Sequence, residues 1–325
     1  MAVEFYGGND SGAKVIADDL DGKINPDIPT SEVAMFNAMG KGEIEVSKYV
    51  YDLVALSFEV YEKSNGAFDI TLSALSKHWR VDSDSLSNYG QAEFPSLPSF
   101  ESLDGFASGM SAISIREEDG KYYLSKAEDF VSIDLGGIAK GYLSDLVCEK
   151  LKANSVKSAI IDVSGNLYLL GKKHTEDGSL LDWKIGVTNC FDNGGEYLCG
   201  IVIPQSTAVV TSGTYERCYQ KDGVKINHII NPHTKMPVGV TYENGYINTS
   251  DYLTSVTVVG GNGALCDAVA TAVCVLGMEQ GKNLVSEFGL SALLVSADGK
   301  YSTVGDIDFM DFTDGNFYIE TLERI

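Results

Sequence analysis

Three separated segments of this chain carry patterns that suit a phosphorylated ligand, and their spacing limits the folds that the chain can adopt. They are Asp134–Tyr142, Ser212–Thr234 and Cys266–Thr271. The first is a glycine-rich turn leading into a predicted helix, and the third places a carboxylate and a hydroxyl on one helical face. Because the segments lie far apart in sequence, a single site requires a fold that brings distant parts of the chain together.

Length and composition describe a large acidic globular protein. Its 325 residues are 44% hydrophobic, which is enough for a sizeable core and argues against global disorder. With 46 acidic and 24 basic residues the net charge is −22, which disfavours nucleic acid and anionic membranes as partners. The same charge repels phosphate, so a phosphate site must be built locally from backbone dipoles, a lysine or a bound cation.

The sequence gives no sign of a membrane span, a leader or a zinc site. No run of about 18 apolar residues appears, so no transmembrane helix is expected in this chain. No signal peptide is visible. The six cysteines form no CxxC pair. Cys190 and Cys199 flank a Gly-Gly loop, and their pairing in a disulfide stays open because spacing does not fix geometry.

Periodicity and turn signals predict an α+β fold. Long helices are expected from Ser47 to Ser64, from Gly136 to Ala153 and from Ala264 to Phe288. Hairpin turns are expected at Asp119-Gly120, Asp222-Gly223 and Asp298-Gly299. Many hairpins with few long helices favour α+β over a repeating βαβ barrel. We expect one domain over 1–325, with two intimately packed lobes and a ligand cleft between them.

The Gly136-Gly137 turn is suited to phosphate. A helix start presents unpaired amides and the positive end of the helix dipole, and small residues let a ligand approach the backbone. Lys140 would point at the same anion. The alternative is an ordinary turn with a surface lysine, and the pattern matches neither the Rossmann nor the P-loop motif.

Asp267 and Thr271, four residues apart, suit Mg²⁺, which prefers oxygen ligands and leaves room for phosphate oxygens. The alternative is a carboxylate at a helix start that stabilises the dipole, with a threonine bonded back to a carbonyl.

His228 ends a predicted strand before a proline turn, and histidine is the natural proton acceptor near neutral pH. It is equally consistent with a turn histidine bonded to backbone. Tyr142 and Tyr215 would each stack on an aromatic ligand or simply pack.

Taken in order, these segments resemble the ApbE family, the flavin transferases that move FMN from FAD onto a protein threonine. The resemblance rests on Ser31, Glu32 and Asn37, on Asn65–Asp69, Trp79, Asp134–Tyr142 and Ser212–Arg217, and on His228–Thr234 and Asp267–Thr271. All stand in the family's order along the chain.

The resemblance implies a T-fold-related α+β structure of mixed and antiparallel sheets with packed helices. It implies FAD as substrate, Mg²⁺ held by the Ala139 carbonyl, Asp267 and Thr271, and His228 as the catalytic base. The acceptor would be a flavoprotein carrying a target threonine, for example an electron-transport subunit. The residues implied to bind FAD are Asn37, Asp69, Gly136, Gly137, Lys140, Tyr142, Ser212, Gly213, Tyr215 and Thr234.

Several positions depart from the family pattern. Thr214 and Asn231 stand where Asp is usual, Lys235 where Gly is usual, and Ser164-Gly165 where Gly-Gly is usual. The opening strand near Val3–Tyr6 is expected to be shortened or altered.

These departures keep other functions open. One is an FAD-binding protein or flavin carrier without transfer activity. Another is a Mg²⁺-dependent FAD pyrophosphatase that yields FMN and AMP, and a third is an unrelated metal-dependent phosphohydrolase. The family's usual location implies a membrane-associated lipoprotein outside the cytoplasm, with the lipid anchor absent from this chain.

Overall fold

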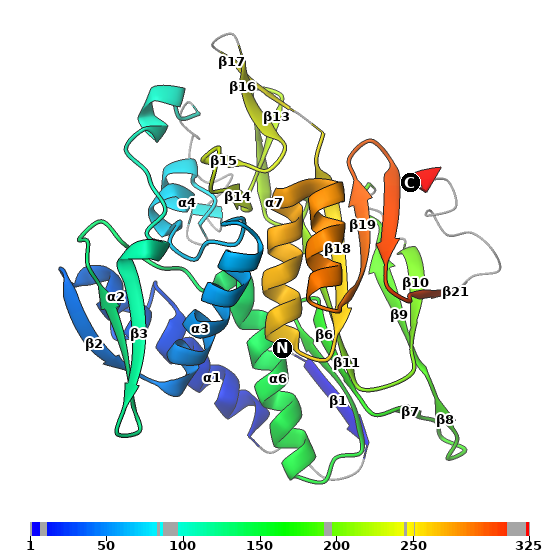
Figure 1. Cartoon of the computed structure of the whole chain (residues 1–325). Coiled ribbons are helices and arrows are strands. Elements are labelled where there is room, and N and C mark those ends of the chain that lie inside the picture. Colours follow the sequence, from blue (N-terminus) through cyan, green and yellow to red (C-terminus); the bar gives the residue numbers. More distant parts are fainter. Residues whose placement is uncertain are drawn as a thin grey trace. The chain divides into compact units, whose positions relative to one another are not determined.

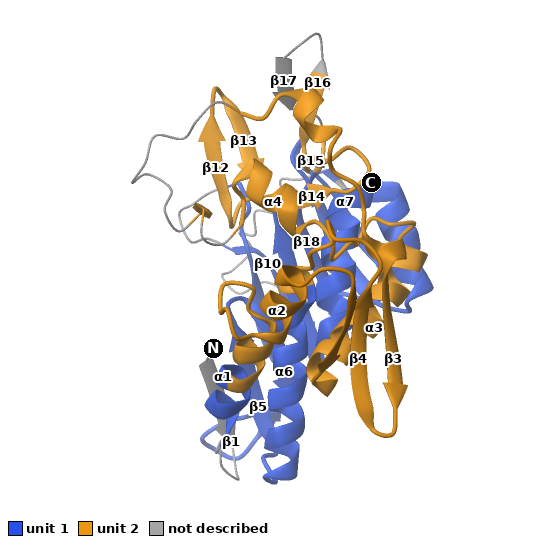
Figure 2. Ribbon diagram, turned by 90° about the vertical axis from the view of Figure 1, so that its left-hand side faces the viewer, with its two compact units in different colours: residues 1–18, 138–213, 253–325 blue, residues 19–137, 214–252 orange. Residues whose placement is uncertain are grey.

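The computed structural model describes residues 2–6, 12–82, 85–86, 97–191, 197–243, 246–249, 251–310 and 323–324. The chain divides into two compact units (Figure 2). Unit 1 comprises residues 1–18, 138–213 and 253–325, and unit 2 comprises 19–137 and 214–252. Helices and several antiparallel sheets confirm the α+β class. The expected packing of two lobes around a ligand cleft stays a prediction.

Unit 1 is built on an eight-stranded sheet (Figure 1). In spatial order its strands are β1 (Ala2–Tyr6), β5 (Ser158–Val163), β6 (Asn166–Leu170), β11 (Thr207–Gly213), β18 (Leu253–Gly260), β19 (Ser291–Ser296), β20 (Lys300–Val304) and β22 (Glu323–Arg324). Neighbours pair antiparallel except β20 and β22. The opening strand is present, since Ala2 pairs with Asp162 and Tyr6 with Ser158.

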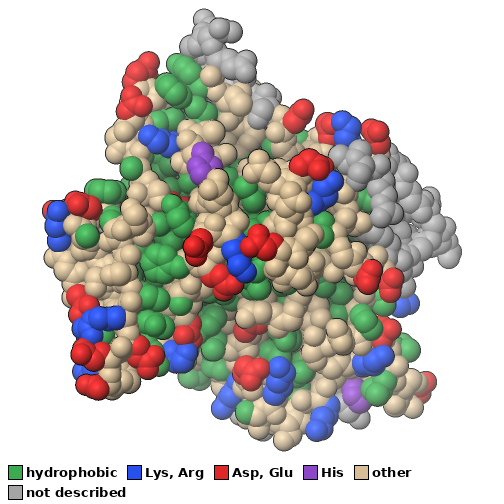
Figure 3. Space-filling model, in the orientation of Figure 1, with side chains coloured by type: hydrophobic (Ala, Val, Ile, Leu, Met, Phe, Trp, Pro, Cys, Tyr) green, Lys and Arg blue, Asp and Glu red, His purple; other side chains and the backbone are tan. Residues whose placement is uncertain are grey.

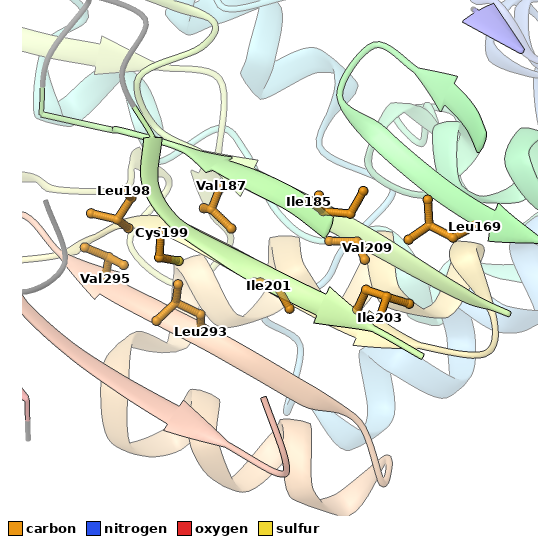
Figure 4. Close-up of a cluster of buried hydrophobic side chains, with 10 residues drawn as sticks. All are labelled: Leu169, Ile185, Val187, Leu198, Cys199, Ile201, Ile203, Val209, Leu293 and Val295. Carbon is orange, nitrogen blue, oxygen red and sulfur yellow. The ribbon is translucent and has the colours of Figure 1, made fainter. Parts of the chain in front are cut away.

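A second sheet in unit 1 consists of β9 (Trp183–Thr188), β10 (Tyr197–Ile203) and β21 (Asp308–Met310). Apolar side chains from β9 and β10 meet those of the large sheet in one buried cluster (Figure 4). Cys199 belongs to this cluster and Cys190 packs against it. Both thiols are free, so the possible disulfide does not form, and burial raises the pKa of Cys199 to about 12. A short hairpin joins β7 (Lys173–His174) to β8 (Leu180–Leu181).

Helix α7 (Gly263–Glu287) packs against β18 and β11. The Asn262 side chain caps it by accepting from the Leu265 amide at 2.8 Å. Gly277, at φ 77° and ψ −174°, interrupts the helix. Within the described ranges, α7 alone is long and apolar enough to cross a membrane, and 56% of its apolar window is buried in the protein. This burial is typical of a core helix.

Two helices join the units through the chain itself. α1 (Ala13–Ile24) begins in unit 1 and ends in unit 2, and α6 (Gly136–Ala153) begins in unit 2 and continues in unit 1. The sequence predicted α6 with these bounds. It did not predict α1, whose Asp-rich stretch and Gly22 obscure the apolar period.

Unit 2 contains the helices α2 (Glu32–Ala38), α3 (Lys48–Lys63) and α4 (Ser73–Trp79) and the short 3-10 helices η1 (Phe100–Leu103) and η2 (Met110–Ala112). Ser31 and Ser47 cap α2 and α3 by accepting backbone N–H bonds. Asn65, at φ 52°, and Gly66, at φ 83°, follow the end of α3.

The strands of unit 2 form one three-stranded sheet and three hairpins. The sheet is ordered β2 (Gly42–Val46), β4 (Lys121–Lys126), β3 (Ile113–Glu118). The hairpins pair β12 (Cys218–Lys221) with β13 (Val224–Asn227), β14 (Ile230–Asn231) with β15 (Met236–Pro237), and β16 (Val240–Glu243) with β17 (Tyr246–Thr249). A buried cluster around Trp79, Leu103 and Ile226 joins α4 and η1 to these hairpins.

The surface carries acidic side chains with basic ones beside them (Figure 3). Lys48 lies 2.7 Å from Asp52, and Arg116 lies 2.6 Å from Glu43. Exposed pairs of this kind contribute little to stability. Burial of apolar side chains therefore contributes more to the stability of each unit than these exposed pairs do.

Candidate active site

The glycine-rich turn at the start of α6 differs from the expected phosphate cradle in one respect. The Gly136 amide donates to Asp134 Oδ1 at 2.8 Å, so a carboxylate of the chain itself already satisfies that amide. A carboxylate at a helix N-terminus also stabilises the helix dipole. A phosphate would have to replace this bond to reach the Gly136 amide, and the role of Gly136 in binding FAD stays a prediction.

Lys140 belongs to a polar network inside unit 1. Its Nζ lies 3.5 Å from Asn166 Oδ1, and Asn166 Nδ2 donates to Asp267 Oδ1 at 2.9 Å. Asn166 is only 1% exposed. Asn166 was not among the residues predicted from the sequence, although an amide at the first position of a buried strand was the available signal.

Asp267 is buried, with 2% of its surface exposed. Its Oδ2 accepts from the Gly141 amide at 2.9 Å, while Oδ1 accepts from Asn166. It lies five residues after the cap Asn262, so it is in the second turn of α7. The alternative of a helix-start carboxylate that serves only the dipole is therefore wrong.

Close contact between two helices places Gly141 beside Asp267. A Cβ on Gly141 would lie 2.0 Å from the Gly263 carbonyl oxygen, so α6 and the start of α7 touch through their backbones. Asp145 accepts from the amides of Gly263 and Ala264 at 2.8 and 2.9 Å. Burial raises the pKa of Asp145 to about 6, although these two backbone bonds oppose the shift.

Thr271 lies one turn beyond Asp267 on α7. Its Oγ1 is 3.4 Å from Ser212 Oγ at the end of β11, so the predicted metal ligand Thr271 and the predicted flavin contact Ser212 meet in unit 1. Gly213 ends the same strand. Tyr142 lies on α6 in the same unit and is partly exposed.

The oxygen atoms of Asp267, Thr271 and Ala139 in unit 1 are of the kind that binds a magnesium ion. A carboxylate, a hydroxyl and the Ala139 carbonyl are hard oxygen ligands, and Mg²⁺ is usually held by one or two carboxylates together with substrate phosphates. Among the described residues no group of three or more His, Cys, Asp and Glu side chains gathers. A site for Mg²⁺ here would thus combine one carboxylate with neutral oxygens.

Asn37 and Asp69 are predicted site residues of unit 2, and each forms hydrogen bonds within that unit. Both polar atoms of the Asn37 side chain bond the Ile133 backbone, at 2.9 and 2.7 Å, so Asn37 fixes the segment leading into α6. Asp69 Oδ1 accepts from the Thr71 amide and hydroxyl. Asp69 Oδ2 is buried and has no hydrogen-bond partner among the described residues, as expected of an oxygen that awaits a ligand donor.

His228 is held by the carbonyl of Arg217. Its backbone amide and its Nδ1 lie 3.1 and 3.2 Å from that oxygen. A proton on Nδ1 would leave the Nε2 lone pair as the acceptor, the arrangement that a general base requires. Tyr215 lies two residues before Arg217 and also falls in unit 2.

The turn after β14 contains two of the departures from the family pattern. Asn231 Oδ1 accepts from the amides of His233 and Thr234 at 2.9 and 3.3 Å. This turn uses a single oxygen, so Asn serves it as well as Asp. Lys235 has φ +62°, the left-handed region that favours glycine, which explains why Gly is usual there. Thr214, the third departure, is fully buried.

Known proteins of similar sequence support the resemblance to the ApbE family. The ApbE family model matches residues 3–294. The FAD:protein FMN transferase of Treponema pallidum is 29% identical over 89% of this chain and 78% of its own length. That of Escherichia coli K12 is 26% identical over 78% of this chain and 66% of its own length.

Solved structures give the same result. The apo flavinyl transferase ApbE of Pseudomonas stutzeri has a TM-score of 0.72 at 25% identity, covering 97% of this chain and 92% of that one. The ApbE protein of Thermotoga maritima has a TM-score of 0.72 at 26% identity, covering 95% and 92%. The α+β fold, the ordered motifs and the matched family model lead to one conclusion: the chain belongs to the ApbE family.

Proposed function

We propose that this chain is an FAD:protein FMN transferase that moves FMN from FAD to a threonine hydroxyl of an acceptor flavoprotein and releases AMP. Relatives and a solved structure named for this activity support the proposal. The observation that carries it is the buried Asp267 carboxylate. It is fixed by Gly141 and Asn166, it has Thr271 one turn further along α7, and its network includes Lys140.

Each residue of unit 1 has a distinct task in this proposal. Asp267, Thr271 and the Ala139 carbonyl would hold Mg²⁺, which neutralises phosphate charge when bound. Lys140 attracts the pyrophosphate of FAD. Asn166 and the Gly141 amide keep the Asp267 carboxylate in one orientation, because each oxygen receives its own N–H donor.

His228 performs the proton transfer. Its Nε2 takes the proton from the threonine hydroxyl as that oxygen attacks the phosphorus on the FMN side of the pyrophosphate. The bond from this phosphorus to the bridging oxygen breaks, and AMP leaves with the bond's electron pair. The Arg217 carbonyl holds the ring by accepting from Nδ1.

A direct test mixes the purified protein with FAD, Mg²⁺ and an acceptor flavoprotein. Covalent FMN on one threonine, measured by mass spectrometry, with an equal amount of AMP, would support transfer. FMN and AMP released without covalent product would support the pyrophosphatase, in which water replaces threonine. Bound FAD with no AMP would support the carrier, the alternative that Thr214 and Asn231 keep open. Turnover of other nucleotides without preference for flavin would support the unrelated phosphohydrolase.

A further inference from the structure

Lys126, the last residue of β4, is a buried lysine that the proposed reaction does not use. Only 2% of its surface is exposed. Lysine is almost never fully buried unless a carboxylate pairs with it, because removing the amine from water is costly. The Lys126 Nζ instead donates to two backbone carbonyls, that of Val131 at 3.0 Å and that of Asn37 at 3.4 Å. Burial lowers the pKa of Lys126, and the charge of Asp129 opposes this shift.

One of the two carbonyls lies at the C-terminal end of α2. Asn37 is the last residue but one of this helix, and the final carbonyls of a helix have no partner inside it. A cationic side chain at this end also offsets the negative end of the helix dipole. The Lys126 Nζ lies 5.1 Å from the centre of the Phe36 ring on the same helix, within the range of a cation–π contact. Lys126 is therefore fixed to the end of α2.

The other carbonyl belongs to the approach segment, residues 131–135, which leads into the glycine-rich turn of α6. Val131 has a long bond from its own amide to the Glu128 carbonyl, at 3.4 Å, so the 3.0 Å bond from Lys126 is the shorter contact of its backbone. The Asn37 side chain bonds the backbone of Ile133 two residues further on. Lys126 and Asn37 thus hold the same short segment at neighbouring positions.

The approach segment in turn determines where the glycine-rich turn begins. The Asp134 amide donates to the Ile70 carbonyl at 2.8 Å, and Asp134 Oδ1 accepts from the Gly136 amide at 2.8 Å. A displacement at Val131 would therefore be passed to Asp134 and from there to Gly136. This connection gives the buried lysine a reason to be retained despite the cost of its burial.

We propose that Lys126 is a positioning residue for FAD: it holds the approach segment so that the turn at Gly136 and Gly137 keeps the shape that the phosphates of FAD require. The inference rests on the proposed function, which supplies FAD as the ligand. A substitution that frees the segment should weaken binding of the phosphates. Binding of riboflavin, which has no phosphate, should not change.

Equilibrium titrations with FAD and with riboflavin, followed by flavin fluorescence, test this inference. They are made without added Mg²⁺, so that FAD is not cleaved, on wild type, Lys126→Met, Lys126→Arg and Lys121→Met. Lys121 lies on the same strand and pairs with Glu45 at the surface, so its substitution controls for the loss of one positive charge.

Lys126→Met should weaken FAD binding by about tenfold, the upper end of what one hydrogen bond supplies, and leave riboflavin binding unchanged. Lys126→Arg keeps N–H donors and should retain most of the wild-type affinity for FAD. Lys121→Met should bind both ligands as the wild type does. A lysine that served the fold alone would not change the ratio of the two affinities.

Equal FAD affinities for wild type and Lys126→Met would overturn the inference while leaving the transferase proposal intact. Equal losses for FAD and riboflavin would overturn it too, because Lys126 would then only support the fold of unit 2. The same loss in Lys121→Met would assign the effect to net charge and would also overturn it. A wild-type protein that binds no FAD would refute the proposed function as well.

A second variant covers the case in which Lys126→Met does not fold. Lys126→Gln has a shorter side chain whose amide can still donate to a carbonyl. It should show a smaller loss than tenfold that is again confined to FAD. A folded Lys126→Gln protein with wild-type affinity for FAD, or with equal losses for both ligands, would overturn the inference.

Discussion

The candidate residues of unit 1 and those of unit 2 are held in different ways. In unit 1, Asp267 and Thr271 lie on a core helix, and buried hydrogen bonds from Gly141 and Asn166 fix the carboxylate. In unit 2, His228 and Asn231 lie at strand ends and turns, and local bonds to backbone hold them. Residues on regular core elements are placed more firmly than residues on loops. Substitution of Asp267 should therefore cost both stability and activity, whereas substitution of His228 should cost activity alone.

Asp267→Ala should show the largest combined effect. It removes the proposed metal carboxylate, so Mg²⁺-dependent FAD cleavage should vanish. It also leaves the Gly141 amide and Asn166 Nδ2 without their acceptor, at about 1–3 kcal/mol for each buried group. The free energy of unfolding in urea and AMP release measure the two effects. A fully stable Asp267→Ala protein would break the contrast between the units, and wild-type cleavage would show that Asp267 is not a ligand.

His228→Ala should slow transfer without loosening the fold. General-base catalysis contributes about 10²–10⁴-fold, and the side chain is only partly buried. Single-turnover transfer at saturating FAD gives the rate, and FAD binding should change little. His233→Ala, in the adjoining turn, is the matched control and should matter less. If His233→Ala were the slower variant, the base would be misassigned.

Gly141→Ala should destabilise the protein by about 3 kcal/mol, because overpacking costs 1–3 kcal/mol and here the added Cβ meets backbone rather than a movable side chain. Urea unfolding measures the difference. Gly22→Ala on α1, where a Cβ would meet nothing within 4 Å, is the control and should be neutral or stabilising. A neutral Gly141→Ala would mean that α6 and α7 do not touch as described.

Asp145 should make unit 1 more stable in mild acid. Its folded pKa of about 6 lies above the ordinary 3.8, so the folded protein binds more protons between these values. Stability from Asp145 should therefore fall as pH rises from about 4 to 6, by at most about 3 kcal/mol. Unfolding of wild type and Asp145→Asn across this range isolates the effect. A stability difference between them that does not change with pH would contradict the buried carboxylate.

The main elements of the fold can be predicted from the sequence where the local signals are strong. The helices α3 and α6 and the three Asp-Gly hairpin turns lie where the sequence predicted them. The helix α1 and the strand β2 escaped prediction. β2 is short and most of its residues are exposed, so its sequence shows no clear strand pattern. Its pairing with β4 decides its structure.

The site was predicted less completely than the fold. Motif order placed Asp267, Thr271 and Ser212 among the site residues, and the structure brings them together. Asn166 was missed because its role depends on Asp267, which lies 101 residues away. The Asp134 bond to the Gly136 amide was missed because nothing local distinguishes a capping aspartate from a neighbour of a phosphate site.

The interleaving of the two units has a consequence for synthesis of the chain on the ribosome. β1 pairs with β5, so Ala2 cannot pair until Asp162 has been synthesised. β11 obtains its second neighbour only when β18, after residue 252, has emerged. All of unit 2 is made before β18, one of the two middle strands of the eight-stranded sheet. Unit 1 cannot complete its sheet from one end during synthesis, and its exposed strand edges need protection until residues 253–325 have been made.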